Sequence, residues 1–523
     1  MTSRIKHPDT MTKREILEAL SGLFLAMFVS MTSGTIVSNA LPTIVGSLNG
    51  TQTQYTWIVT ATLLTSTVAT PIWGKLADLL HKKLLLQIAL AIFTMASIGA
   101  GFAQTVAWLI ALRALQGIGL GGVQALAQTV MAAMIPPRER GKYNGYMGGI
   151  MAVATIGGPL IGGAIVDSPL GWRWVFFVGA PFAVAAMVLL QKTLHLALQP
   201  RRVKVDYLGA TLLSAGVSIL LIWVTFAGQS FAWASGQSAL MVGAAVVLLI
   251  ATVMVERRVA EPIIPLDIVV QRTPALAIIG SLAVGIGMFG GSVFLGQYFQ
   301  IARGYSPTAA GLLMGPMMIG LIVTSTVAGR LISGHGHFKK YLVSGSVLLA
   351  LGFALLATMD HRSSLVFIGG ALFIAGAGLG MTMQNLVLAV QNTVAIRDIG
   401  ASTSTVTFFR SLGGTVGVGV LGAMVANQLT AHIAAGLAHL GITLPAGGGS
   451  SSTLDLNAMP TPVAQVVRTA YGDVTGHVFL VASVLSVVGL IAVLLIKEVP
   501  LRETLAQPRS DEETIDTGIL VEV

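Results

Sequence analysis

Long apolar stretches alternate with short polar segments along almost the whole chain. An α-helix needs about 20 apolar residues to cross the roughly 30 Å of hydrocarbon in a bilayer. Stretches of this length recur throughout the sequence and predict fourteen membrane-spanning helices. The predicted spans are residues 17–41, 55–73, 84–103, 106–131, 143–166, 174–191, 207–227, 236–255, 275–299, 308–329, 340–359, 364–390, 404–426 and 476–496. We therefore expect an all-α integral membrane protein.

Composition supports this class and excludes several others. Hydrophobic residues make up 54% of the 523 and charged residues only 10%, whereas soluble proteins carry about 25% charged residues. The absence of cysteine excludes disulfides, thiol catalysis and cysteine-based metal sites. Residues 1–18 are polar and basic, and the apolar stretch after them is long enough to span, so no cleavable signal peptide is expected.

The basic residues predict how the spans are oriented. With residues 1–16 placed inside, 24 of the 30 Lys and Arg residues fall on that side and four on the other. Basic residues favour the cytoplasmic side of a membrane. We therefore expect a multi-pass protein of the cell membrane with both termini in the cytoplasm. Topology then accounts for the net charge of +9, which is not evidence for nucleic-acid binding.

Long connections predict how the chain is divided. Two six-helix bundles are expected, with an added helix pair between them and a long outer loop near the end. The expected segments are 1–16 (cytoplasmic), 17–191 (first bundle), 192–206 (cytoplasmic loop), 207–255 (inserted pair), 256–274 (cytoplasmic loop), 275–497 (second bundle, with 427–475 as the outer loop) and 498–523 (cytoplasmic tail). Within the outer loop, residues 431–440 predict a short amphipathic helix.

A weak internal repeat supports the two-bundle arrangement. The Gly-x-Gly-x-Gly pattern that begins at Gly117 recurs at Gly376, and the Gly-basic-Leu pattern at Gly74 recurs at Gly329. Both offsets are close to 255–260 residues. Duplicated bundles with a site between the halves are the usual construction of secondary transporters.

The fifth predicted span contains Gly-Gly-Pro-Leu-Ile-Gly-Gly, which ends at Gly163. Glycine and proline oppose helix formation in water, but small residues in a bilayer let helices approach closely. Ala154, Gly158 and Gly162 recur every four residues and so share one helix face. Pro159 removes a backbone hydrogen bond and predicts a bend. A simple packing groove would explain the glycines but not the proline.

The segment after the second span reads Gly-Lys-Leu-Ala-Asp-Leu-Leu-His-Lys-Lys, from Gly74 to Lys83. An ordinary cytoplasmic loop would explain Lys82 and Lys83, but not the acidic Asp78. An aspartate at the end of a span, beside basic residues, is suited to an electrostatic contact across a helix interface.

Arg113 lies within the fourth predicted span, roughly 10 Å from its outer end at about 1.5 Å per residue. A charge at such a depth is costly and usually faces a cavity or a partner. The alternative is an arginine whose side chain extends to the outer membrane surface. We expect Arg113 to be the only charge near the middle of the membrane.

These motifs resemble those of the major facilitator superfamily, in particular its fourteen-span drug:proton antiporters of the EmrB/QacA type. Gly74, Asp78, Lys82 and Lys83 match the inner-loop motif G-x-x-x-D-R-x-G-R-K, and the Gly-Pro run matches the antiporter motif. The resemblance implies the major facilitator fold, an Asp78 contact that holds the transporter outward-open, and a role of Arg113 in proton transfer. Leu79 and His81 depart from the inner-loop motif, where Arg and Gly are usual, and imply a weaker or differently built contact.

One further departure concerns proton coupling. The first span carries Thr-Ile-Val-x-x-Ala-Leu-Pro from Thr35, as in the family, but Ser33 stands where an aspartate is common. A serine hydroxyl does not titrate, and no Asp or Glu lies in the middle of a predicted span. Coupling either uses Asp78, Arg113 and water, or the protein works as a uniporter or couples otherwise.

Polar residues within the spans are candidates for a substrate cavity. Each of them alone is also explained as an interhelical hydrogen-bonding group, but the set suits a neutral or weakly charged amphiphile. A dication would lie unpaired there at high cost. The candidates are Ser33, Asn39, Gln116, Gln124, Gln128, Gln297, Gln384 and Asn385.

The motifs together predict a secondary active transporter that exports amphiphilic drugs or other small molecules by proton antiport and alternating access. The alternative is an importer or uniporter of a metabolite or siderophore on the same fold. No H-E-x-x-H, G-x-S-x-G or Walker sequence is present. We accordingly expect no enzyme activity, no cofactor, no metal and no nucleic-acid partner. The expected partners are the substrate, protons and the lipid bilayer, and the expected state is a monomer.

Overall fold

The computed structural model describes residues 13–166, 168–196, 206–228, 230–259, 261–439 and 461–503. This part of the chain is helical and contains no β-strand. The helices are α1 (Lys13–Ser47), α2 (Gln52–Leu79), α3 (Lys82–Gly101), α4 (Val106–Met134), α5 (Pro137–Val166), α6 (Trp174–Phe177), α7 (Gly179–Thr193), α8 (Tyr207–Phe226), α9 (Gly236–Glu256), α10 (Leu266–Val269), α11 (Arg272–Gln297), η2 (Tyr298–Ala302), α12 (Pro307–Leu313), α13 (Gly315–His335), α14 (Lys339–Ala357), α15 (Leu365–Thr393), η3 (Ile396–Asp398), α16 (Ile399–His439) and α17 (Thr461–Leu495).

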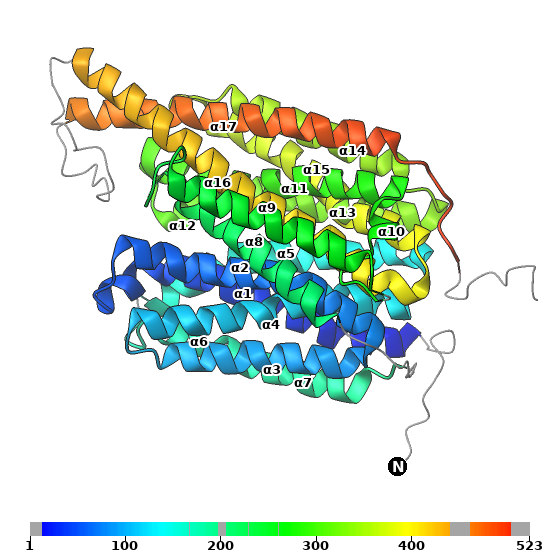
Figure 1. The fold of residues 1–523 in the computed structure, drawn as a ribbon. Coiled ribbons are helices and arrows are strands. Elements are labelled where there is room, and N and C mark those ends of the chain that lie inside the picture. The colour runs from blue at the N-terminus through cyan, green and yellow to red at the C-terminus, as the bar shows by residue number, and fades with distance from the viewer. Residues whose placement is uncertain are drawn as a thin grey trace, which may run out of the picture.

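Twelve helical segments in the described part are long and apolar enough to cross a membrane. The sequence predicted fourteen, and the two predicted spans outside this set correspond to α2 and α5. Helix α2 is less apolar because it is rich in threonine, whereas several side chains of α5 fall outside the described part of the chain. Both nevertheless lie alongside the other long helices in the same bundle (Figure 1).

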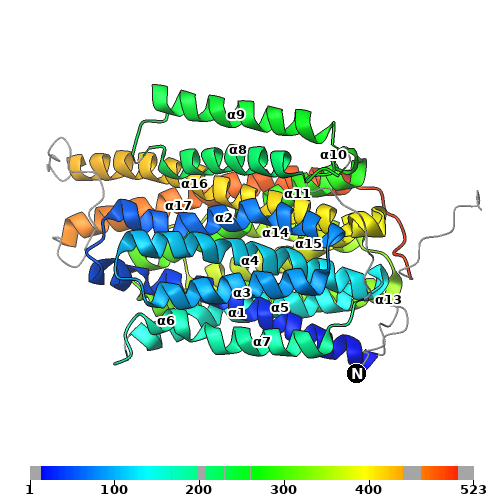
Figure 2. The same cartoon turned by 60° about the horizontal axis from the view of Figure 1, so that its bottom comes forward.

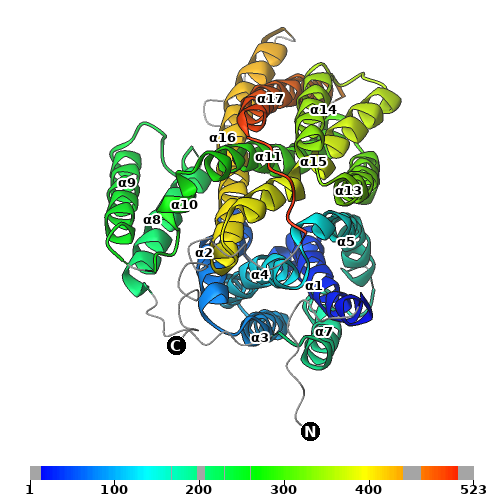
Figure 3. The same cartoon turned by 90° about the vertical axis from the view of Figure 1, so that its right-hand side faces the viewer.

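Seen along the helix axes, the long helices form two groups (Figure 3). The N-terminal group contains α1–α7 and the C-terminal group contains α11–α17. The groups meet along two seams, where α2 packs against α16 and α5 packs against α13. Helices α8 and α9 pack against each other, and α9 lies outermost at the edge of the molecule (Figure 2).

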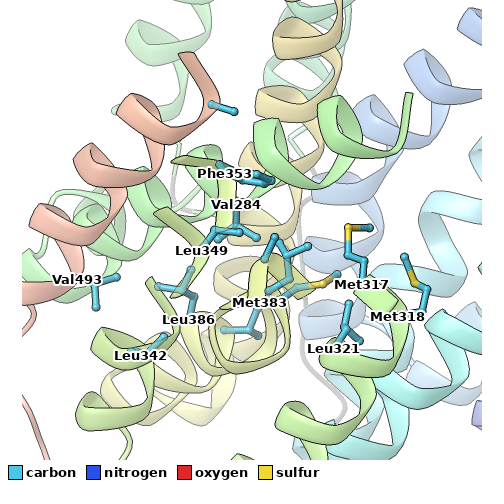
Figure 4. Close-up of a cluster of buried hydrophobic side chains, with 14 of the residues drawn as sticks. Val284, Met317, Met318, Leu321, Leu342, Leu349, Phe353, Met383, Leu386 and Val493 are labelled. Carbon is cyan, nitrogen blue, oxygen red and sulfur yellow. The ribbon is translucent and has the colours of Figure 1, made fainter. Parts of the chain in front are cut away.

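Each group has its own apolar core. In the C-terminal group, side chains from α11, α13, α14, α15 and α17 interdigitate around Phe353 and Met383, which are almost inaccessible to solvent (Figure 4). A second core around Leu86 and Leu126 joins α3 and α4 to α1 and α7. Large apolar side chains also point outward, such as Leu240 and Val247 of α9. A lipid environment accommodates such exposed apolar residues, which are unfavourable in water.

Much of the predicted outer loop 427–475 is helical. Helix α16 continues without interruption to His439, and α17 already begins at Thr461. The amphipathic helix predicted at 431–440 is therefore the end of α16 over residues 431–439 and not a separate surface element. Residues 427–439 contain no proline and are rich in alanine and leucine, which favour helix continuation. Both extensions project beyond the bundle at its left end in Figure 1. Residues 440–460 lie outside the described part.

Candidate functional site

Asp78 joins the two groups at the end of the bundle where α1 begins and α17 leads to Glu503, which we call the termini end. Its Oδ1 accepts the Gly400 N–H at 2.8 Å, and its Oδ2 accepts the Ala401 N–H at 2.6 Å. Both donors lie in the first turn of α16, where N–H groups lack intrahelical partners and the helix dipole attracts an anion. We call this pair of hydrogen bonds the gate contact.

Burial has a strong effect on the Asp78 carboxyl, which lies beyond the predicted span 55–73. Desolvation raises its pKa from 3.8 to about 7, although the two N–H donors and the charges of Lys82 and Lys75 oppose this rise. The gate contact therefore contains a group that titrates near neutral pH.

Glycines bring α2 and α16 into backbone contact beside Asp78. A Cβ on Gly74 would overlap the Ser404 hydroxyl and would lie 2.7 Å from the Gly400 carbonyl oxygen. A Cβ on Gly400 would lie 2.5 Å from Asp78 Oδ1. Gly74, the first residue of the inner-loop motif, is therefore needed for steric reasons, because a side chain there would push α2 and α16 apart and break the gate contact.

The other motif residues have different surroundings. The charge of Lys82 acts on Asp78, whereas Lys83 donates to the Gln191 carbonyl at 2.7 Å and so stays within the N-terminal group. His81, which replaces the usual glycine, accepts the Leu84 N–H through Nδ1 at 3.4 Å and caps α3. Leu79 is buried.

A second link across the interface was not predicted from the sequence. Arg140 of α5 is buried and donates to Gln391 Oε1 of α15 at 3.0 Å. Gln391 Nε2 in turn donates to Thr403 Oγ1 of α16 at 2.9 Å. In the sequence, Arg140 is one of the basic residues expected on the cytoplasmic side. The internal repeat was a usable signal, because Arg140 precedes Gly141, which closely contacts Gly329, the repeat glycine in the second half of α13.

The α5–α13 seam depends on this close contact. A Cβ on Gly141 would lie 2.5 Å from the Gly329 carbonyl oxygen, and a Cβ on Gly145 would lie 2.7 Å from Thr326 Cα. Small residues thus allow the backbones of the two groups to touch.

The antiporter motif packs within the N-terminal group. A Cβ on Gly158 would overlap the Thr35 hydroxyl, and a Cβ on Gly162 would lie 3.0 Å from the Ile36 carbonyl oxygen. Thr35 Oγ1 also donates to the Ala154 carbonyl at 3.1 Å. The shared face of the motif therefore lies against α1. The side chains of Pro159 and Asn39 fall outside the described part of the chain, and Gly163 is half-buried.

Three predicted site residues meet in one hydrogen-bonded chain. Arg113 Nη1 donates to Gln116 Oε1 at 2.7 Å, and Gln116 Nε2 donates to Ser33 Oγ at 3.2 Å. All three are buried, and Arg113 is only 4% exposed. The alternative that Arg113 extends to the outer surface is therefore wrong. Its Nε has no hydrogen-bond partner, so the guanidinium keeps an unused donor.

The remaining cavity candidates do not form one cluster of hydrogen bonds. Gln128 and Gln384 are buried, and Gln128 Oε1 and Gln384 Nε2 lack hydrogen-bond partners. Asn385 donates to the Met381 carbonyl of its own helix at 2.7 Å. Gln124 is half-buried and Gln297 is exposed.

The expectation that Arg113 is the only mid-membrane charge is wrong. Arg410 lies in α16 within the predicted span 404–426, is buried, and donates to the Met383 carbonyl at 3.3 Å. The sequence already carries this signal, because Arg410 is a basic residue inside a predicted span. Each group thus carries one buried guanidinium within a predicted span, Arg113 in the N-terminal group and Arg410 in the C-terminal group.

An apolar crevice lies between the two groups on the α5–α13 side. Its volume is about 580 Å³, and α1, α5 and α13 contribute its walls. Phe28, Tyr146 and Ile322 line it. No group of three or more His, Asp or Glu residues in the described part is arranged to hold a metal ion.

Comparison with known proteins identifies the family. The model of the Major Facilitator Superfamily matches residues 23–418. The chain belongs to this superfamily. It is a multi-pass membrane transporter of small molecules and not an enzyme.

Curated relatives of this superfamily protein cover most of its length. It is 33% identical to the multidrug transporter protein MdtP of Bacillus subtilis, over 96% of each chain. It is 36% identical to an uncharacterized MFS-type transporter of Mycobacterium tuberculosis, over 92% of this chain and 70% of the relative. Multidrug resistance protein 3 of Bacillus subtilis is 28% identical over 92% of this chain and 95% of its own.

Solved structures share the fold. The proton:xylose symporter XylE superimposes with a TM-score of 0.61 at 13% identity, covering 91% of this chain and 95% of the symporter. The human organic anion transporter MFSD10 gives 0.60 at 14% identity, covering 90% and 99%. At these identities the likeness concerns the fold alone.

Proposed function

We propose that the protein exports amphiphilic small molecules across the cytoplasmic membrane by alternating access, driven by proton antiport. The observation that carries this proposal is the gate contact, in which Asp78 of one group caps α16 of the other. A contact between helix groups that consists of two charge-assisted hydrogen bonds can form and break as a unit. The multidrug relatives support export as the direction.

The distribution of contacts supports a state that is closed at the termini end. Among the described residues, the hydrogen bonds that join the two groups lie at this end. Besides the gate contact, Arg140 bonds Gln391, and Arg138 of α5 bonds the Ser333 carbonyl and Glu503. With both termini in the cytoplasm, this arrangement corresponds to an outward-facing state.

The proposed topology has fourteen spans, with α2 and α5 crossing the membrane beside the twelve more apolar segments. Helices α8 and α9 then form an added hairpin between two six-helix bundles, as their peripheral position supports (Figure 3). An even number of crossings keeps both termini on the basic side. We propose a monomer, because each seam is completed within one chain.

The substrate is proposed to be a neutral or weakly charged amphiphile. The Ser33–Gln116–Arg113 chain supplies hydrogen-bonding groups without a carboxylate. The apolar crevice between α1, α5 and α13 suits the hydrophobic part of such a molecule. A buried cationic substrate would find no counter-ion in this chain of residues.

An importer or uniporter of a metabolite or siderophore is the second candidate. Ser33 favours it, since this position offers no titratable group beside Gln116. Transport in everted and right-side-out vesicles, with and without a pH gradient, separates the two. Uptake into everted vesicles that requires an acidic interior supports the export proposal. Gradient-independent movement, or uptake into right-side-out vesicles, contradicts it.

A further inference from the structure

Four charged side chains lie where the α8–α9 hairpin meets the end of α2. Asp206 precedes α8, Glu256 ends α9, Glu261 follows in the connection to α10, and Lys75 belongs to α2. Asp206, Glu256 and Lys75 are 6%, 3% and 4% exposed. Lys75 Nζ donates to Glu261 Oε2 at 2.7 Å. Burying charges is costly unless they are paired, and here Lys75 pairs with Glu261 while its charge also acts on Glu256.

The two buried carboxyl groups of the hairpin have opposite surroundings. Asp206 caps α8, where its Oδ1 accepts the Gly209 N–H at 2.8 Å. The helix N-terminus there favours a negative charge. Glu256 lies at the C-terminal end of α9, where the helix dipole disfavours a negative charge. Its Oε1 accepts the Ile264 N–H at 3.1 Å. The end of α9 therefore favours the protonated form of the Glu256 carboxyl.

Further observations indicate that Asp206 and Glu256 together bind a proton. Asp206 Oδ2 is buried and has no hydrogen-bond partner. Among the described residues, the charges of Asp206 and Lys75 act on the Glu256 carboxyl. A proton on Glu256 would relieve the repulsion between the two carboxylates. Among the described residues, Arg257 and Arg258 directly follow Glu256 in the sequence, and both are exposed.

The two charged residues of η3, the short helix before α16, compensate each other. The η3 segment, which packs against α2, carries Arg397 and Asp398. These two residues pair with each other at 3.3 Å. They therefore do not replace Lys75 as the cation near Asp206, Glu256 and Glu261.

Lys75 connects the cluster with the gate contact. It precedes Asp78 by three residues on α2, so both side chains lie on one face. Its charge acts on Asp78 as well as on Glu256. We propose that Glu256, with Asp206 beside it, is a proton-binding site, which Lys75 links electrostatically to the gate contact.

The consequence is that the α8–α9 hairpin regulates the gate. When Glu256 loses its proton, its carboxylate draws Lys75 toward the hairpin. Asp78 then loses part of the positive field that favours its ionised form, so it keeps its own proton to higher pH. The exposed arginines that follow Glu256 place this end of α9 beside water, from which the proton comes. This consequence for transport rests on the proposed function, whereas proton binding itself does not.

The first test measures proton binding in the resting protein. Infrared difference spectra of the purified protein in lipid nanodiscs, recorded between acidic and alkaline pH without substrate, report the protonated-carboxyl band. We expect Glu256→Gln to remove a component of this band, and the matched control Glu139→Gln, at an exposed position, to leave the band unchanged. Asp206→Asn, which retains a capping side chain, should lower the titration midpoint by about one pH unit, and Lys75→Met should raise it.

These variants also show how the proposal fails. If Glu256→Gln leaves the band intact, or only Asp78→Asn removes it, the proton lies at the gate and the proposal is overturned. If Glu256→Gln does not fold, the opposite shifts in Asp206→Asn and Lys75→Met decide, and equal or absent shifts contradict the proposal. This test does not use transport in vesicles, so failure of the proton-binding proposal can be distinguished from failure of the export proposal.

The second test measures the link to the gate. Because the chain has no cysteine, spin labels at Leu80→Cys and Ile396→Cys report the distance across the gate contact. We expect the pH midpoint of the distance change to move to lower pH in Glu256→Gln and to stay unchanged in Glu139→Gln. An unchanged midpoint in Glu256→Gln overturns the link between hairpin and gate.

Discussion

The Asp78 carboxylate lies 2.6 Å from the backbone nitrogen of Ala401, a residue 323 positions later in the chain. This contact places an ionisable group of the N-terminal helices on the first turn of a C-terminal helix. Its energy depends on charge, on burial and on the close approach of Gly74 to Ser404. Opening the termini end requires all three to change together.

Replacing Asp78 with Asn should slow turnover more than it weakens substrate binding. Asparagine keeps the shape and one acceptor oxygen but cannot ionise, so it lacks the buried charge that disfavours the closed interface. The closed interface should therefore open less readily, and we expect turnover to fall by about tenfold. Transport kinetics in vesicles measure the maximal rate and the apparent KM separately. A large change in KM with an unchanged rate would place Asp78 in the substrate site instead.

The gate contact should also depend on pH. The pKa of Asp78 is about 7 in the closed interface and 3.8 in water. A carboxyl group whose pKa is higher in the closed interface binds its proton more tightly there. Acidification through pH 7 should therefore favour the closed interface, and a rise of pH should loosen it. The spin-label distance between positions 80 and 396 should shift to longer values above neutral pH in the parent protein, with little change in Asp78→Asn. A distance that becomes longer on acidification would contradict this prediction.

Gly158→Ala should impair transport strongly, and Gly158→Leu should abolish it, while both proteins remain in the membrane. A Cβ at this position overlaps the Thr35 hydroxyl of α1, so the two helices must separate. Gly157→Ala is the matched control, because its Cβ would lie 4.0 Å from the nearest atom, Ile161 Cδ1 of the same helix. Transport and membrane content are measured together. Equal activity of the two alanine variants would reduce the motif to incidental packing.

Arg113→Ala should flatten the dependence of transport on the pH gradient. The substitution removes a buried guanidinium and leaves Gln116 without its donor, which disconnects the chain to Ser33. Arg410→Ala is the informative comparison, since Arg410 is also buried but donates to the Met383 carbonyl and not to Gln116. Initial rates at several imposed gradients measure the effect. Normal gradient dependence in Arg113→Ala would show that the proton uses another group.

The topology is tested with single cysteines, because the protein has none of its own. A cysteine at Ser451 should react with an impermeant reagent added outside intact cells, and a cysteine at Ser510 should react only after the membrane is opened. This pattern follows from fourteen spans with both termini in the cytoplasm. The reverse pattern would exclude that topology.

The sequence by itself was sufficient for the class of protein, for the position of most helices and for the family. Apolar length and the exclusion of charges are local properties, and a bilayer selects for them directly. The same local criterion explains the errors. Residues 427–439 contain polar side chains but continue α16, and Arg410 lies in a span although it is charged.

The tertiary structure decided which residues meet. The sequence marked Asp78 as a residue for a contact across the interface, but its partners are backbone N–H groups, which carry no signature in the side-chain pattern. It marked Ala154, Gly158 and Gly162 as one face, and only packing shows that this face lies against α1. The pairing of Arg140 with Gln391 and of Lys75 with Glu261 joins residues that are distant in sequence. Such contacts depend on how helices are placed in space, which the periodicity of one helix does not determine.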